Sequence, residues 1–246
     1  MLFKDRAIIN LDVTDSTNQY ASHLLRSAAP PDGTVITAQV QHQGRGQRGT
    51  DWESNPGENL LCSIIVYPIE LNSYNHFYLS KVIAIALQEL LEENLDREVL
   101  LKWPNDLIVA HKKIAGVLIE TTWNHQRLHS AVIGIGLNLN QLNFNTAKAT
   151  STRLISGNYW EPQDCLKALL IKFEKYYFKL VSGQYNEITK QYRDHLYRLG
   201  QPMKFEYNGK AIDAMITGVD EDGKLRLHCG NGESLSCGLK EIKMVY

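Results

Sequence analysis

A glycine-rich loop between two apolar runs limits the fold of this chain more than any other feature. Gly44, Gly46 and Gly49 follow the run TVITAQV, and the turn-forming stretch TDWESNPGEN leads directly into a second run, LLCSIIVY. The glycines have the GxGxxG spacing of a dinucleotide fingerprint, and Glu70 lies at about the required ~20-residue offset. That fingerprint needs a helix to begin inside it, and the second run leaves no room for a crossover. The segment therefore favours strand, loop and strand over a dinucleotide-binding unit.

The chemistry of this loop indicates an anionic ligand. Arg45 and Arg48 lie among the glycines where a strand ends. Glycine lets a ligand approach the backbone closely, N–H groups in such turns form anion-binding concavities, and guanidinium groups match carboxylate and phosphate oxygens. A kinase-type loop is disfavoured because Asp51 stands where that pattern has valine. A nucleotide or carboxylate loop of another kind and a plain surface loop both stay open at this point.

Hydrophobic patterns predict an α+β fold with a mixed or antiparallel sheet. Asp15 or Ser16 is expected to cap a helix that extends to Ala29. Residues 76–95, 162–182 and 184–198 are also expected to be helical. Short β-rich runs separated by turn signals are AIINLDV, VLLKW, DLIVA, IAGVLIETT and HSAVIGIGLNL.

The chain is expected to divide at residue 200. Residues 1–199 contain the helices and the larger sheet, whereas residues 200–246 alternate short strands with turns such as Asn208-Gly209. The second part reads as a small β-barrel. Because it is near the size limit for independent stability, it is expected to pack on the first part.

The amino-acid composition limits the classes of partner that this chain can bind. The 246 residues are 43% hydrophobic and carry 26 Lys+Arg against 27 Asp+Glu, a formal net charge of -1. No general positive field recruits nucleic acid, no apolar run approaches the ~20 residues of a membrane span, and the first residues lack a secretory signal. The sequence therefore predicts a cytoplasmic protein with a local anion site, and neither DNA nor a membrane as partner.

Five motifs in order resemble the biotin protein ligases. They are DSTNQYA (residues 15–21), the glycine loop, KWPNDLIV (residues 102–109), KIAGVLIE (residues 113–120) and GIGLNLN (residues 134–140). The resemblance is strong over roughly residues 10–140. It implies a catalytic domain like the core of class II aminoacyl-tRNA synthetases and an SH3-like barrel at residues 200–246. It also implies the reaction: biotin and ATP, with Mg²⁺, form biotinyl-5'-AMP and pyrophosphate, and a lysine of a biotin carboxyl carrier protein then takes the biotinyl group.

The resemblance assigns site residues at the matching positions. The residues implied for biotin are Ser16, Thr17, Asn18, Gln41, Arg45, Gly46, Gln47, Lys113 and Gly116. Those implied for ATP are Arg45, Arg48, Trp52, Asn105, Lys113 and Asn138. Arg45, Lys113 and Asp106 are the implied catalytic residues, and metal ligands are left unassigned.

Several of these residues also have an ordinary structural interpretation. Ser16 alone would be a common helix cap, Gly116 a β-bulge and Arg45 a solvated loop residue. Trp52 could pack on adenine or hold the loop down. A register error of one residue would exchange Lys113 for the neighbouring Lys112.

The hypothesis for Asp106 is that it helps to deprotonate or position the incoming lysine of the carrier. Its replacement by asparagine is expected to slow transfer to the carrier more than adenylate formation. Gln47 and Thr50 stand where relatives can have basic residues, which predicts a weaker grip on the adenylate and its faster release.

The remaining expectations concern partners and alternatives. About 14 residues precede Asp15, so a winged DNA-binding domain is not expected, and neither is a repressor role. An exposed sheet edge could pair with a second copy, giving a homodimer, or with the carrier. The competing functions are a lipoate ligase or transferase, whose substrate has no ureido group, and a non-catalytic RNA-binding module.

Overall fold

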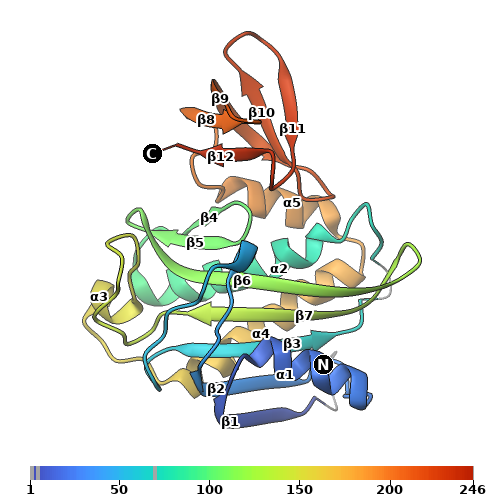
Figure 1. The fold of residues 1–246 in the computed structure, drawn as a ribbon, viewed down its shortest axis with the longest axis vertical. Coiled ribbons are helices and arrows are strands. Elements are labelled where there is room, and N and C mark those ends of the chain that lie inside the picture. Colours follow the sequence, from blue (N-terminus) through green and yellow to red (C-terminus); the bar gives the residue numbers. More distant parts are fainter. Residues whose placement is uncertain (1–2, 4–5, 69–70, 246) are drawn as a thin grey trace.

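The computed structural model describes residue 3 and residues 6–68 and 71–245. Two sheets organise this part of the chain, a seven-stranded sheet in the order β1-β2-β3-β7-β6-β5-β4 and a five-stranded sheet in the order β11-β10-β9-β8-β12 (Figure 1). The strands of the first sheet are β1 (Ile8–Thr14), β2 (Val35–Gln41), β3 (Leu60–Val66), β4 (Leu100–Lys102), β5 (Asp106–Val109), β6 (Lys112–Asn124) and β7 (Arg127–Leu137). Those of the second are β8 (Pro202–Tyr207), β9 (Lys210–Val219), β10 (Leu225–Cys229), β11 (Ser234–Cys237) and β12 (Ile242–Met244).

The larger sheet is mixed, and the predicted α+β class is confirmed. β1 pairs with β2 in parallel, and the pairs β2–β3, β3–β7, β7–β6, β6–β5 and β5–β4 are antiparallel. The glycine loop connects β2 to β3, two neighbouring antiparallel strands. This connection is the strand, loop and strand arrangement that the apolar runs predict, and it has no crossover helix.

Helices cover both faces of this sheet. α1 (Thr17–Ser27) lies on the front face in Figure 1, whereas α2 (Phe77–Leu95) and α4 (Pro162–Val181) lie behind it. α2 is apolar nearly all round and buries most of its residues, because the sheet covers one side of it and α4 and α5 (Tyr185–Asp194) cover the other. No helix of the described residues is long and apolar enough to cross a bilayer.

Two helical predictions need correction. The last helix ends at Asp194 rather than at residue 198, because the next residues pair with β4: Leu101 N donates to His195 O and Tyr197 N donates to Leu101 O. A short helix, α3 (Thr152–Ser156), lies between β7 and α4, where no helix was predicted, and its first turn is capped by Ser151.

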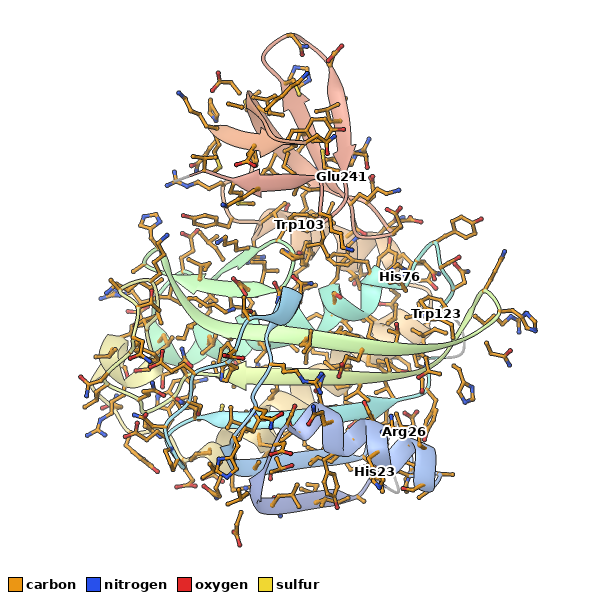
Figure 2. All side chains as sticks on the ribbon, in the orientation of Figure 1. His23, Arg26, His76, Trp103, Trp123 and Glu241 are labelled. Atoms are coloured by element: carbon orange, nitrogen blue, oxygen red, sulfur yellow. The ribbon has the colours of Figure 1, made fainter. Side chains whose placement is uncertain are left out.

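The second sheet packs against the first part of the chain. Its strands are all antiparallel and enclose a small apolar core that includes Phe205 and Ile216, both fully buried. Trp103 lies at the junction between the two parts (Figure 2), where its Nε1 donates to Gly223 O over 2.9 Å. Gly223 also leaves room for Phe77 of α2, whose ring a Cβ there would approach to 2.6 Å. These contacts explain how so small a sheet is stabilised, and the division at residue 200 stays a prediction.

Candidate active site

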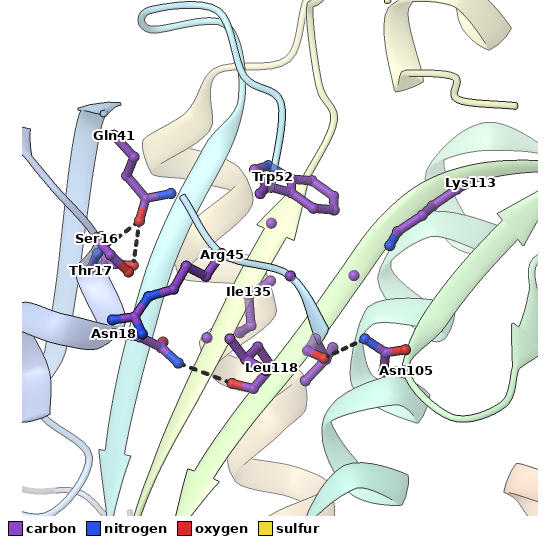
Figure 3. Close-up of a pocket in the computed structure, with 15 residues that line it drawn as sticks. Ser16, Thr17, Asn18, Gln41, Arg45, Trp52, Asn105, Lys113, Leu118 and Ile135 are labelled. Atoms are coloured by element: carbon purple, nitrogen blue, oxygen red, sulfur yellow. Dashed lines mark hydrogen bonds between the residues drawn. The ribbon is translucent and has the colours of Figure 1, made fainter. Parts of the chain in front are cut away.

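A cavity with about 430 Å³ of empty space, open solvent included, lies above the middle of the larger sheet (Figure 3). It lies between the start of α1, the glycine loop and the central strands β6 and β7. Its lining residues are Ser16, Thr17, Asn18, Gln41, Arg45, Gly46, Trp52, Asn105, Lys113, Gly116, Val117, Leu118, Gly134, Ile135 and Gly136. The structure thus brings residues from all five sequence motifs to one place, and the glycine loop lies over the cavity.

The start of α1 presents polar groups to the cavity. Ser16, Thr17 and Asn18 are all buried, with exposed fractions of 2%, 4% and 4%. Ser16 is the N-cap residue by its extended backbone, but its side chain makes no capping hydrogen bond. Its hydroxyl therefore remains available to a ligand, which the simple helix-cap interpretation would not predict.

A hydrogen-bonded chain joins the polar end of the cavity. Thr17 donates to Gln41 Oε1 from its backbone N (2.7 Å) and from its hydroxyl (3.1 Å). Ser63 Oγ lies 2.8 Å from Thr17 Oγ1 and 2.7 Å from Asn18 Oδ1. Asn18 Nδ2 in turn donates to Leu118 O on β6. Because each member is held by its neighbours, this end of the cavity offers polar atoms in fixed positions.

Bare backbone forms the middle of the cavity floor. Gly116 of β6 and Gly136 of β7 are direct partners across the sheet. The indole of Trp52, from the glycine loop, lies over both: a Cβ at Gly136 would overlap Trp52 Cε2, and one at Gly116 would lie 2.9 Å from Trp52 Cζ3. Lys113 Nζ is 5.2 Å from the centroid of the same indole. Glycine at these two positions is thus required by the close approach of an aromatic ring, not by a bulge.

Arg45 and Lys113 line the cavity from different sides (Figure 3). The Arg45 side chain extends from the glycine loop toward the start of α1 and Asn18, while Lys113 extends from β6. Backbone contacts close the loop. Arg45 and Asp51 form an isolated antiparallel β-bridge, Gly46 N donates to Thr50 O, and Trp52 N donates to Gly44 O. One cation is thus carried by the loop and the other by the sheet.

The side of the cavity at β5 and β6 holds a charged pair. Lys113 Nζ lies 2.6 Å from Asp106 Oδ1. Strand alternation turns Lys113 toward the cavity and leaves Lys112 exposed. Asn105 adjoins them and is fixed by two bonds with Val117, Asn105 Nδ2 to Val117 O and Val117 N to Asn105 O.

The comparisons with known proteins agree with this geometry. Residues 11–138 match the Biotin/lipoate A/B protein ligase family, and residues 199–246 match the Biotin protein ligase C terminal domain. The first match alone covers more than half of the chain.

This chain belongs to the biotin/lipoate A/B protein ligase family.

Three relatives show how far the similarity extends within the family. The biotin protein ligase of Aquifex aeolicus in complex with biotin and ATP superposes with a TM-score of 0.80 at 26% identity, over 97% of this chain and 98% of that one. The bifunctional ligase/repressor BirA of Bacillus subtilis is 28% identical over 230 residues, which are 92% of this chain and 70% of the relative. The biotin--[acetyl-CoA-carboxylase] ligase of Paracoccus denitrificans is 26% identical over 223 residues, 87% of this chain and 91% of the relative.

Three expected site residues whose side chains the structure describes, Gln47, Asn138 and Asp106, do not line this cavity. Asp106 lines two neighbouring pockets instead, both of which also include Lys113. Gln47 faces a groove between β4–β5 and the second sheet, together with Thr50. Asn138 is buried, its Nδ2 donates to Thr150 O, and its Oδ1 lacks a hydrogen-bond partner among the described residues. Arg48 belongs to a short turn of helix, η1 (Gln47–Gly49), and its side chain lies outside the described part of the structure. Their assigned roles stay predictions.

The sequence analysis missed several residues that shape the cavity. Ser63 is fully buried in β3 and holds Thr17 and Asn18, and Gly134 and Gly136 of β7 leave room for Asn18 and Trp52. The signals were present in the sequence. Ser63 is the polar residue within the apolar run LLCSIIVY, and the two glycines alternate in GIGLNLN, so both fall on one face of a strand.

Proposed function

We propose that this chain joins biotin to a lysine of a biotin carboxyl carrier protein, using ATP. The carboxylate of biotin attacks the α-phosphorus of ATP, which gives biotinyl-5'-AMP and pyrophosphate, and the lysine amine then attacks the mixed anhydride and releases AMP. The observation that carries the proposal is a single cavity that combines buried polar groups at one end with two cations.

The two ends of the cavity suit the two ends of biotin. The ureido ring is neutral and polar, and burying it requires matched hydrogen-bond partners, which Ser16, Thr17 and Gln41 provide. Trp52 and the glycine floor offer an apolar surface to the rest of the bicycle. A lipoyl group has no ureido ring and would leave the buried polar atoms unpaired, so the same geometry disfavours lipoate.

Arg45 and Lys113 are proposed to act on the reacting groups. A carboxylate and a triphosphate repel one another, and fixed cations both bring them together and stabilise the charge that develops in the transition state. Lys113 is carried by β6 and is therefore already positioned, whereas Arg45 is carried by the glycine loop. Loop ordering around the ligand would complete the site.

In this proposal Mg²⁺ binds together with the nucleotide. No group of three or more His, Cys, Asp or Glu side chains that could hold an ion is present among the described residues. Mg²⁺ usually needs only one or two protein ligands in addition to substrate phosphates and water, and Asp106 with Asn105 at the cavity rim are the candidates. Bound there, the ion would neutralise part of the triphosphate charge.

The test is pyrophosphate release from ATP and Mg²⁺ with biotin, and with lipoate in a parallel reaction. Release with biotin and little with lipoate is the expected result. Release that depends on lipoate instead would reassign the chain to lipoate ligation. No release with either acid, together with salt-sensitive RNA binding, would favour the binding module.

The second substrate and the oligomeric state need separate experiments. Transfer is expected to label one lysine of a carboxylase carrier domain, which mass spectrometry would locate. β1 forms one edge of the larger sheet, whereas residues 195–197 pair with β4 at the other. A homodimer through the β1 edge is therefore part of the proposal, and light scattering with and without biotin tests it.

A further inference from the structure

Ser63 connects the two polar residues of α1 from beneath the cavity. Its side chain is 0% exposed, so it cannot touch a ligand. Its Oγ lies 2.8 Å from Thr17 Oγ1 and 2.7 Å from Asn18 Oδ1. A hydroxyl has one hydrogen to donate and two lone pairs that accept. Which of the two neighbours receives that hydrogen decides what Thr17 can offer to the cavity.

The surroundings of Asn18 fix the direction of this chain of hydrogen bonds. Asn18 Nδ2 donates to Leu118 O over 3.2 Å and to Glu120 Oε2 over 2.9 Å. Both partners are acceptors, so the amide cannot turn over without facing oxygen with oxygen. Asn18 Oδ1 therefore points to Ser63, and it has no hydrogen of its own. The Ser63 hydrogen must go to Asn18.

Thr17 is constrained in turn. With the Ser63 hydrogen committed to Asn18, the 2.8 Å contact between the two hydroxyls is a hydrogen bond only when Thr17 donates to Ser63 Oγ, and Gln41 Oε1, 3.1 Å away, is the alternative acceptor for the same hydrogen. Both acceptors belong to the protein. The part of the Thr17 hydroxyl that remains for a ligand is a lone pair, which accepts a hydrogen bond and cannot give one.

Gly134 provides the space on which this arrangement depends. It is the partner of Ser63 across the β3–β7 pair, and a Cβ there would overlap Asn18 Oδ1 and lie 2.8 Å from Asn18 Cγ. The Asn18 amide thus lies directly on the backbone of Gly134. A larger residue at position 134 would displace the amide that orients Ser63.

We propose that Ser63 is a positioning residue that keeps Thr17 as a hydrogen-bond acceptor, so that the cavity selects a ligand with an N–H group at this point. A cyclic urea has such a group, and a ligand with only a carbonyl or ether oxygen there does not. This inference rests on the proposed function and adds the residue that sets the polarity of the biotin site.

The experiment compares KM for biotin with KM for ATP in pyrophosphate release. Ser63→Ala is expected to raise KM for biotin about tenfold, the size of one neutral hydrogen bond, and to leave KM for ATP within about twofold. Gly134→Ala, which leaves Ser63 in place and displaces Asn18, is expected to act in the same direction. Ser130→Ala is the matched control, since Ser130 is also buried in the sheet, in β7, but does not line the cavity.

The outcomes separate this inference from the proposed function. An active wild-type enzyme with an unchanged KM for biotin in Ser63→Ala would overturn the inference alone, as would an equal rise of both KM values, which indicates a general structural defect. A wild-type chain that releases no pyrophosphate with biotin would overturn the proposed function and the inference with it. If Ser63→Ala does not fold, Ser63→Cys, of similar volume but with a weak donor, replaces it in the same comparison.

Discussion

Lys113 Nζ and Asp106 Oδ1 lie 2.6 Å apart where β6 runs beside β5. The two side chains keep exposed fractions of 34% and 21%, and ion pairs that water still reaches add little to stability. The value of the contact is therefore positional. It holds the ammonium of Lys113 beside the cavity and holds the carboxylate of Asp106 where an incoming amine could meet it.

Lys113→Ala should reduce adenylate formation strongly. Loss of one group that stabilises developing charge costs roughly 10²–10³ in kcat, and the fall should appear in biotin-dependent pyrophosphate release. Lys112→Ala is the matched control, because Lys112 precedes it in the same strand but is exposed. A larger effect at Lys112 than at Lys113 would mean that the wrong lysine has been placed in the site.

Asp106→Asn should slow the second half-reaction more than the first. A lysine amine of pKa ~10.4 is the free base in only about one molecule in 2,500 at pH 7, a cost of roughly 4.6 kcal/mol. A carboxylate that takes up or orients the proton reduces this cost, and asparagine cannot. The measurement is single-turnover transfer from preformed biotinyl-adenylate to the carrier, compared with pyrophosphate release.

The ion pair with Lys113 suggests a different role for Asp106, which the same experiment tests. If the carboxylate only orients Lys113, both half-reactions will lose rate equally in Asp106→Asn, because the ammonium serves the carboxylate and phosphate oxygens in each. Such an equal loss would remove the role of Asp106 toward the carrier lysine and leave it as a positioning residue for Lys113.

Local patterns predicted the elements of this fold better than their ends. The apolar spacing of residues 76–95 places α2 almost as observed, with His76 as its N-cap. The 184–198 prediction fails after Asp194 because the chain pairs there with β4. That pairing is a tertiary contact, and periodicity within one segment cannot report it.

The same contrast between local patterns and tertiary contacts applies to the site residues. Ordered motifs brought Ser16, Gln41, Arg45 and Lys113 to one cavity, because each motif lies at the end of a strand or the start of a helix. Ser63 was missed, since its importance comes from lying under α1, 46 residues away from Thr17 in sequence. Buried residues that hold others in place are visible only once the strands are in register.

Gly136→Ala should impair the site without unfolding the protein. The new methyl group would overlap the indole of Trp52, so the ring must leave the floor of the cavity. We expect at least a tenfold loss of biotin-dependent pyrophosphate release and a shifted tryptophan emission. Gly230→Ala is the control, because a Cβ there meets nothing closer than 3.7 Å. Unchanged emission and activity in Gly136→Ala would show that Trp52 does not rest on this glycine.

A buried lysine far from the cavity gives a prediction about stability. Lys81 of α2 is 1% exposed, and its Nζ has no hydrogen-bond partner among the described residues. Nζ lies 4.4 Å from the centroid of the Tyr78 ring. Burial lowers the pKa of Lys81 to about 8, although Glu221 and Asp220, in the turn between β9 and β10, partly oppose the shift. At pH 7 the folded protein thus carries a buried ammonium.

Lys81→Met should therefore stabilise the protein, most strongly near neutral pH. The unfolded chain holds its proton up to pH ~10.4, and the folded chain releases it from about pH 8. Between these values the unfolded state binds more protons, so the free energy of unfolding of the wild type rises with pH. Below pH 8 both states are protonated and the cost of the buried charge is constant. The variant should gain on the order of 3 kcal/mol at pH 7, and the gain should shrink by pH 10. Urea denaturation at both pH values measures this gain in the free energy of unfolding, with the exposed Lys167→Met as control.

A variant equally destabilised at both pH values would show that the Tyr78 ring and the two carboxylates stabilise the ammonium more than burial destabilises it.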